Sequence, residues 1–428
     1  MEQYKKIDMK KSLFIIVLSL LSGTGQLSGQ ISLELCIEAA VKNYPQFLQY
    51  ALAQNTASYK IESANKAYLP QFSITAKATY QSDVTGIPLS IPGVSIESMD
   101  KGQYGATLQI DQIIWDGGLA SARRSSAISE RERDFAKTTA DIYQIRERVN
   151  QLYFGILLMN SNLRSTSILI NELNRSVERV KSMVDLGVAT TTDLDLLKVE
   201  LLNAKQREVD LQYNRRAYFS MLQEMTAIKF AENAEFEIPA EAPVEQFSNA
   251  NRPEFASFNA SERFLEEQKK FINAGNMVKV GAFIQGGYGK PGLNMLKNTP
   301  ESYYIGGLKL SWNLGGLYTA KRDKALLDIQ KQNIGVQREL FKYNLNLQIA
   351  KEVENIKRLK SALDTDCKMI LLREEILKAS EAKLEKGTIT VTDYLDDISR
   401  LDLANLNKNS HEMEYLYSIT TYKYLTNN

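Results

Sequence analysis

An internal repeat limits the folds open to this chain more than any other feature of its sequence. Residues 184–194 read VDLGVATTTDL, and residues 384–394 read LEKGTITVTDY. The identical residues stand 200 positions apart and are Gly187 and Gly387, Thr190 and Thr390, Thr192 and Thr392, and Asp193 and Asp393. Because self-similarity at a fixed spacing marks a duplicated structural unit, we expect two copies of one arrangement.

A second match helps to set the bounds of the repeats. GGLASARR at residues 117–124 corresponds to GGLYTAKR at residues 315–322, 198 positions later. The small change in spacing fits one short deletion between the two matches. We therefore predict a first repeat at residues 31–230, a linker at residues 231–250 and a second repeat at residues 251–428.

Two segments in each repeat alternate between apolar and polar residues. In the first of them the apolar positions are Phe72, Ile74, Ala76, Ala78 and Tyr80. Because the side chains of a β-strand point alternately to opposite faces, this pattern predicts a strand with one wet face. By the same criterion we predict strands at about residues 71–82, 104–115, 278–288 and 303–314.

The remainder of each repeat has the apolar spacing of long helices. Residues 119–186 contain no proline, and at about 1.5 Å per residue one helix of this length spans roughly 100 Å. Two apolar seams at helical spacing flank Gly187; they are Leu173, Val177, Val180 and Val184, then Leu194, Leu197, Leu201 and Ala204. We predict a mixed, mainly α fold with long coiled-coil hairpins whose tips lie near residues 187 and 387.

The N-terminus has the order of a secretory signal peptide. Lys10 and Lys11 precede an apolar run at residues 13–21, and small or polar residues follow as far as Gln30. We assign residues 1–29 to this signal and expect export. The run is too short to span a bilayer as a helix, and no later stretch approaches 18 consecutive apolar residues. If the protein crosses a membrane, we expect it to do so with strands.

The composition excludes several classes of function. The 52 basic and 51 acidic side chains leave a net charge of +1, so no field of one sign points to nucleic acid. The chain has one histidine, His411, and two cysteines, Cys36 and Cys367, so we predict no metal centre. We expect no cofactor, no enzyme activity, and both cysteines packed inside the fold.

The strands themselves imply an assembly. Four strands cannot close a barrel, because about eight are needed to close one around side chains. Two copies would supply 8 strands and a filled interior, and three would supply 12 and an open one. We predict that the polar face, which carries Lys77, Asp111, Lys279 and Lys309, lines a wet lumen.

A periplasmic coiled-coil scaffold without membrane insertion is the alternative, because it would use the same helices. Four tyrosines argue against it, because aromatic residues near strand ends suit a lipid interface. These are Tyr80, Tyr104, Tyr288 and Tyr304, all on the predicted outward face.

The order of short motifs resembles the TolC-like outer membrane efflux proteins. The motifs are the opening helix at residues 31–45, Tyr68-Leu69-Pro70 before the first strand, Trp115-Asp116-Gly117-Gly118 after the second, and both Gly-x-x-Thr tips. The resemblance implies a homotrimer with a 12-stranded outer membrane barrel and a helical tube in the periplasm. It implies the exit duct of a tripartite efflux or type I secretion system, with a periplasmic adaptor protein and an inner membrane transporter as partners.

The resemblance also assigns roles to residues at the tips. It implies that the adaptor docks on Leu186, Gly187, Val188 and Thr190 of the first tip, and on Lys386, Gly387, Thr388 and Thr390 of the second. Asp393 and Asp396 match the paired aspartates of the family's periplasmic gate, whereas we expect Asp193 to cap a helix. At two positions where the family's best-known member has the tyrosine and arginine that lock the closed mouth, this chain has Leu384 and Ile389.

Overall fold

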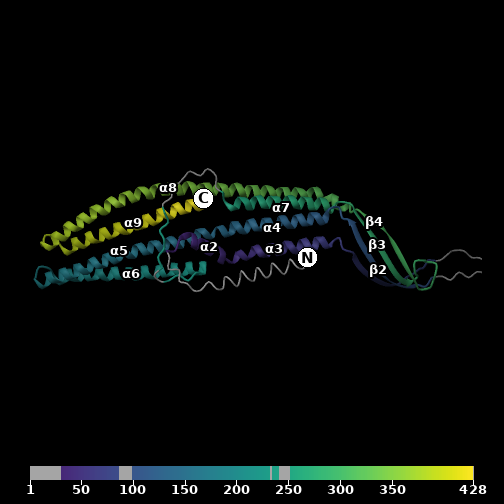
Figure 1. Cartoon of the computed structure of the whole chain (residues 1–428), viewed down its shortest axis with the longest axis horizontal. Coiled ribbons are helices and arrows are strands. Elements are labelled where there is room, and N and C mark those ends of the chain that lie inside the picture. Colours follow the sequence, from purple (N-terminus) through teal and green to yellow (C-terminus); the bar gives the residue numbers. More distant parts are fainter. Residues whose placement is uncertain (1–29, 86–98, 232–233, 241–250, 428) are drawn as a thin grey trace, which may run out of the picture. The chain divides into compact units, whose positions relative to one another are not determined.

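The computed structural model describes residues 30–85, 99–231, 234–240 and 251–427 (Figure 1). The predicted signal peptide therefore lies outside the described residues. The elements follow in the order α2, η1, α3, β1, β2, α4, α5, α6, α7, β3, β4, α8 and α9. They form two compact units, one built from residues 1–47, 140–252 and 342–428, the other from residues 48–139 and 253–341.

One antiparallel sheet dominates the second unit. Its strands are β1 (Gln71–Tyr80), β2 (Gly102–Trp115), β3 (Lys279–Lys290) and β4 (Glu301–Ser311), and they lie side by side in this order. The fourth strand ends at Ser311 rather than near residue 314. Its last pair joins Ser311 to Lys279, the first residue of β3.

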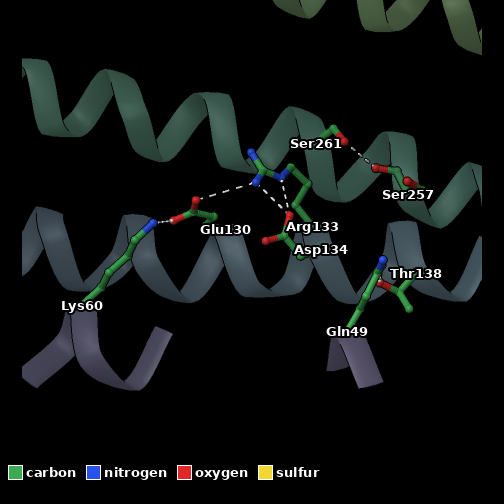
Figure 2. Close-up of polar contacts among 8 residues, drawn as sticks. All are labelled: Gln49, Lys60, Glu130, Arg133, Asp134, Thr138, Ser257 and Ser261. Atoms are coloured by element: carbon green, nitrogen blue, oxygen red, sulfur yellow. Dashed lines mark hydrogen bonds and ion pairs between the residues drawn. The ribbon is translucent and has the colours of Figure 1, made fainter. Parts of the chain in front are cut away.

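The helices of the second unit are α3 (Leu48–Lys66), most of α4 (Leu119–Tyr143), α7 (Pro253–Gly275) and the first part of α8 (Gly315–Glu385). Figure 2 shows polar contacts on α3 and α4. Lys60 of α3 pairs with Glu130 of α4 at 2.5 Å, and the Arg133 guanidinium donates to Asp134 at 2.8 Å. The same guanidinium lies over the Phe264 ring of α7, 4.3 Å from its centroid. Arg133 therefore contacts both an acidic neighbour on its own helix and an aromatic ring of α7.

The first unit contains α2 (Leu33–Asn43), α5 (Ile145–Asp185), α6 (Thr191–Thr226), α9 (Val391–Thr426) and the remainder of α8. Figure 1 shows two hairpins, α5 with α6 and α8 with α9. The single helix expected over residues 119–186 is interrupted at Gln144, which keeps right-handed helical angles. Pro45 begins the short 3₁₀ turn η1 (Pro45–Phe47) between α2 and α3, because proline cannot continue the hydrogen bonding of α2.

Both apolar seams predicted from the sequence are confirmed as one core in the first unit. All eight seam residues belong to a cluster that includes Tyr394 and Ile398 of α9. The α5–α6 hairpin therefore packs against the second hairpin as well as within itself. None of the helices in the part of the chain that the structure describes is long and apolar enough to span a membrane.

Part of the predicted linker also belongs to a core. Phe236 is buried among Tyr153, Phe219 and Phe230, and Ile31 forms a β-bridge with it. The Tyr153 hydroxyl lies 2.7 Å from the carbonyl oxygens of both Ile31 and Glu237, so it can donate its one hydrogen to either of them. This segment therefore contributes packing as well as connection.

The two cysteines differ in their surroundings. Cys36 is fully buried, and burial raises the pKa of its thiol to about 12. Cys367 of α8 is exposed, so the expectation that it is packed was wrong. The residue before it, Asp366, faces α9, and its carboxylate lies 2.6 Å from Nδ1 of His411. Because successive residues of a helix point about 100° apart, Cys367 points in a different direction from Asp366.

Candidate functional site at the hairpin tips

The first hairpin turns at Gly187 through a compact set of backbone hydrogen bonds. Gly187 has φ +74°, a conformation that glycine adopts without a steric penalty. Its N–H donates to the Val184 carbonyl at 2.9 Å, and the N–H of Val188 donates to the Met183 carbonyl at 2.8 Å. This pattern satisfies the last carbonyls of α5 and ends the helix.

The second hairpin turns in the same way. Gly387 has φ +66°, its N–H donates to the Leu384 carbonyl, and the N–H of Thr388 donates to the Lys383 carbonyl. The surfaces of the two tips differ, however. Leu186 and Val188 of the first tip are 79% and 62% exposed, whereas the matching positions of the second tip are the exposed Lys386 and Thr388. The first tip is therefore apolar and the second is polar and basic.

A capping box begins the returning helix of each hairpin. The Asp193 backbone N–H donates to the Thr190 hydroxyl at 3.1 Å, while the Asp193 carboxylate accepts from the Thr190 N–H at 2.9 Å. Thr390 and Asp393 repeat these contacts at the start of α9. The hydrogen bonds from threonine lower the pKa of both carboxyl groups. Asp393 thus caps its helix as Asp193 does.

The second residue of the expected gate pair carries an ion pair. Asp396 accepts from Nε of Arg400 at 2.6 Å, one turn further along α9. The neighbouring Asp397 accepts from the Ser380 hydroxyl of α8 at 2.5 Å. The structure therefore places Asp393 and Asp396 one turn apart, each already bound to a neighbour. Arg400 was not predicted from the sequence, although its spacing of four from Asp396 was a usable signal.

A buried polar network joins the two hairpins below the tips. The Tyr394 hydroxyl of α9 donates to the Glu172 carboxylate of α5 at 3.1 Å and lies 3.1 Å from the Ser176 hydroxyl. Burial is the main cause that raises the pKa of Tyr394. Arg179 of α5 pairs with Glu381 of α8 at 2.5 Å. Sequence reasoning missed these residues, because the partners lie 202 to 222 positions apart.

Leu384 and Ile389, which the resemblance set at the positions of a lock, both pack in the core shared by the hairpins, and Leu384 is fully buried there. Apolar side chains at these positions form no hydrogen bond. The polar contacts between the hairpins are therefore made by other residues, the network around Tyr394 and Arg179 among them.

The sheet holds the remaining charged candidates on one face. The pairing of neighbouring strands shows this. Steps between paired residues of adjacent strands, combined with steps of an even number of residues along one strand, link all four residues: Lys77, Asp111, Lys279 and Lys309. Because opposed residues of antiparallel strands point to the same side, all four project from one face. Asp111 also accepts from the Gln109 side chain at 2.8 Å. The opposite face is apolar and carries Ile74 and Leu308.

Comparisons with known proteins relate the chain to outer membrane proteins. Residues 36–227 match the family model described as outer membrane efflux protein. The chain is 23% identical to the outer membrane protein TolC of Vibrio cholerae serotype O1, over 96% of this chain and 94% of that protein.

Solved structures share the fold. The outer membrane protein VceC of Vibrio cholerae aligns with a TM-score of 0.66 and 15% identity, over 92% of this chain and 96% of that one. The CmeC outer membrane channel of Campylobacter jejuni aligns with a TM-score of 0.65 and 13% identity, over 92% and 85% of the two chains. The helical hairpins, the open sheet and these matches together show that the chain is similar to the TolC-like outer membrane efflux proteins.

Proposed function

We propose that this chain is the exit duct of a tripartite efflux or type I secretion system, through which substrates pass from a transporter and adaptor across the periplasm and the outer membrane. The match of residues 36–227 to the outer membrane efflux protein family and the similarity to TolC support this proposal, because both belong to transport channels rather than to enzymes. The observation that carries the proposal is a four-stranded sheet whose apolar face is exposed in the single chain.

The edges of the sheet support closure by further copies. Among the described strands, β1 and β4 each pair on one side only, so both outer edges present free backbone groups. In lipid such groups are costly, because no water is available to bind them. Three copies of four strands supply 12, enough for a barrel with an open lumen lined by Lys77, Asp111, Lys279 and Lys309.

Exposed apolar stripes on the helices support the same assembly. Leu326, Ile329, Val336 and Leu340 follow one another along α8 at spacings of 3, 7 and 4 and are all exposed. On α6 a comparable stripe comprises Val199, Leu202, Val209 and Tyr213. Stripes with this spacing are typical of helices that pack against other helices. We propose that neighbouring copies of this chain cover them in a helical tube.

The mass of the assembly tests this architecture. Three copies close the sheet and cover the stripes, so the protein purified in mild detergent should have the mass of three chains. Cell fractionation should recover it with the outer membrane. A stable monomer or dimer would contradict the barrel, and a soluble periplasmic protein would support the coiled-coil scaffold instead.

We propose that the two tips dock the periplasmic adaptor through Leu186, Gly187, Val188 and Thr190, and through Lys386, Gly387, Thr388 and Thr390. Leu186 and Val188 are exposed apolar side chains beside a rigid turn, which suits a contact with an apolar partner surface. We also propose that Asp393 and Asp396 of the three chains ring the narrow periplasmic mouth.

Replacing Leu186 and Val188 together with glutamate tests the docking. Charged side chains at these exposed positions leave the turn intact, because Gly187 and the backbone hydrogen bonds are unchanged. We expect the adaptor to be lost from affinity-purified complexes and export to fall, while the protein still assembles in the outer membrane. Adaptor recovery at the wild-type level would remove the first tip from the docking surface.

A further inference from the structure

We infer that Arg400 lowers the negative charge of the periplasmic mouth by pairing with Asp396, so that Asp393, Asp396 and Arg400 together contribute a net charge of −1 per chain instead of −2. The inference rests on the proposed function, because it concerns the gate of the duct. It makes Arg400 a residue that determines ion selectivity.

Asp393, Asp396 and Arg400 form an exposed row on one face of α9, beside Asp397, which is half-buried and accepts a hydrogen bond from Ser380 of α8. Asp393, Asp396 and Arg400 are spaced by three and four positions, which places them in a row along the helix. All three are exposed or half-exposed, and the side chains of Asp396 and Arg400 have 57% and 54% of their surfaces accessible. Tyr394 and Ile398 lie on another side of α9 and are buried in the hairpin core. The row is therefore free to face a lumen.

The ion pair joins the second and third members of this row. Nε of Arg400 lies 2.6 Å from Oδ2 of Asp396, within hydrogen-bond distance and with the favourable order of an acid four positions before a base. Asp393 differs, since its carboxylate accepts from Thr390, which is uncharged. The charges of this row per chain are therefore −1, −1 and +1, a sum of −1.

In an assembly of three chains, the effect of Arg400 on the charge of the mouth is three times larger than in one chain. Six carboxylates and three guanidiniums give a ring of charge −3, whereas the carboxylates alone would give −6. In a narrow passage with walls of low dielectric constant, fixed charge of one sign concentrates ions of the opposite sign. Arg400 therefore keeps the mouth only moderately selective for cations and lowers the electrostatic barrier that anionic cargo meets there.

Ion selectivity in planar bilayers tests the role of Arg400. The purified wild-type channel, Arg400→Gln, Asp396→Asn and the double variant are compared by reversal potential across a KCl gradient. We expect Arg400→Gln to raise the ratio of potassium to chloride permeability about twofold or more, and Asp396→Asn to lower it. The double variant removes no net charge and should resemble the wild type. The effects should shrink near 1 M salt, where the Debye length is about 3 Å.

Lys198→Gln is the matched control. Lys198 forms a similar exposed pair with Asp195 on α6, the helix of the first hairpin that corresponds to α9. Its replacement should leave the permeability ratio unchanged. If Asp396→Asn alters the ratio and Arg400→Gln does not, the inference about Arg400 is overturned while the gate stands. If the wild-type protein forms no conducting channel, the proposed function itself fails.

Discussion

Arginine in place of Ile74 should prevent stable insertion of the protein in the outer membrane. Ile74 lies in the middle of β1, on the apolar face of the sheet, and is 80% exposed in the single chain. If that face contacts lipid, an arginine there costs about 2–4 kcal/mol per chain near the bilayer midplane. The expected result is loss of the protein from the outer membrane fraction, measured by fractionation and immunoblotting.

Thr75→Arg is the control for this experiment. Thr75 is the next residue of the same strand and is also exposed, but it shares the polar face with Lys77. In water the two arginines are equivalent, so any difference between the variants reports the environment of the two faces. We expect Thr75→Arg to assemble normally. Equal behaviour of the two variants would show that the apolar face does not meet lipid.

Tyr153→Ala should strongly destabilise the first unit. Tyr153 of α5 is completely buried, and it packs against Phe154 and Phe236. Truncation of a buried aromatic side chain to alanine costs about 3–5 kcal/mol, because a cavity remains where the ring was. The loss should appear as a lower midpoint in thermal or denaturant unfolding followed by circular dichroism.

Two variants separate the contributions of the ring and the hydroxyl. Tyr153→Phe keeps the ring but leaves the carbonyl oxygens of Ile31 and Glu237 without this donor, so we expect a smaller loss of about 1–3 kcal/mol. Tyr59→Ala, at an exposed tyrosine of α3, should have little effect. A loss at Tyr153→Ala no greater than that at Tyr59→Ala would contradict the importance of this core.

Local sequence patterns were enough to predict the elements and the turns. Alternation located the strands, because side-chain direction in a strand depends only on position along it. The period of the seam residues located the paired helices, and all eight residues pack as expected. Glycine followed by a threonine cap predicted both hairpin turns, since these hydrogen bonds join residues only three to five positions apart.

The candidate site was predicted only in part, for a physical reason that its residues illustrate. Asp393 could be placed from the sequence because its partner Thr390 is three positions away. The partner of Arg400 is also local, and that ion pair could have been predicted from the same helical spacing. The case of Tyr394 is different. No residue near it in the sequence indicates whether its hydroxyl joins a polar network or its ring fills an ordinary core position.

The sequence by itself determined the helices, the strands, their amphipathic faces and the two turns, because those depend on contacts between near neighbours in the chain. Only the tertiary structure decided that Tyr394 meets Glu172, that Phe236 of the predicted linker enters a core, and that Cys367 faces outward. Each of these depends on which side of a helix meets an element far away in the sequence. Helical periodicity defines the faces of a helix, but the choice of neighbour for each face follows from packing of the whole unit.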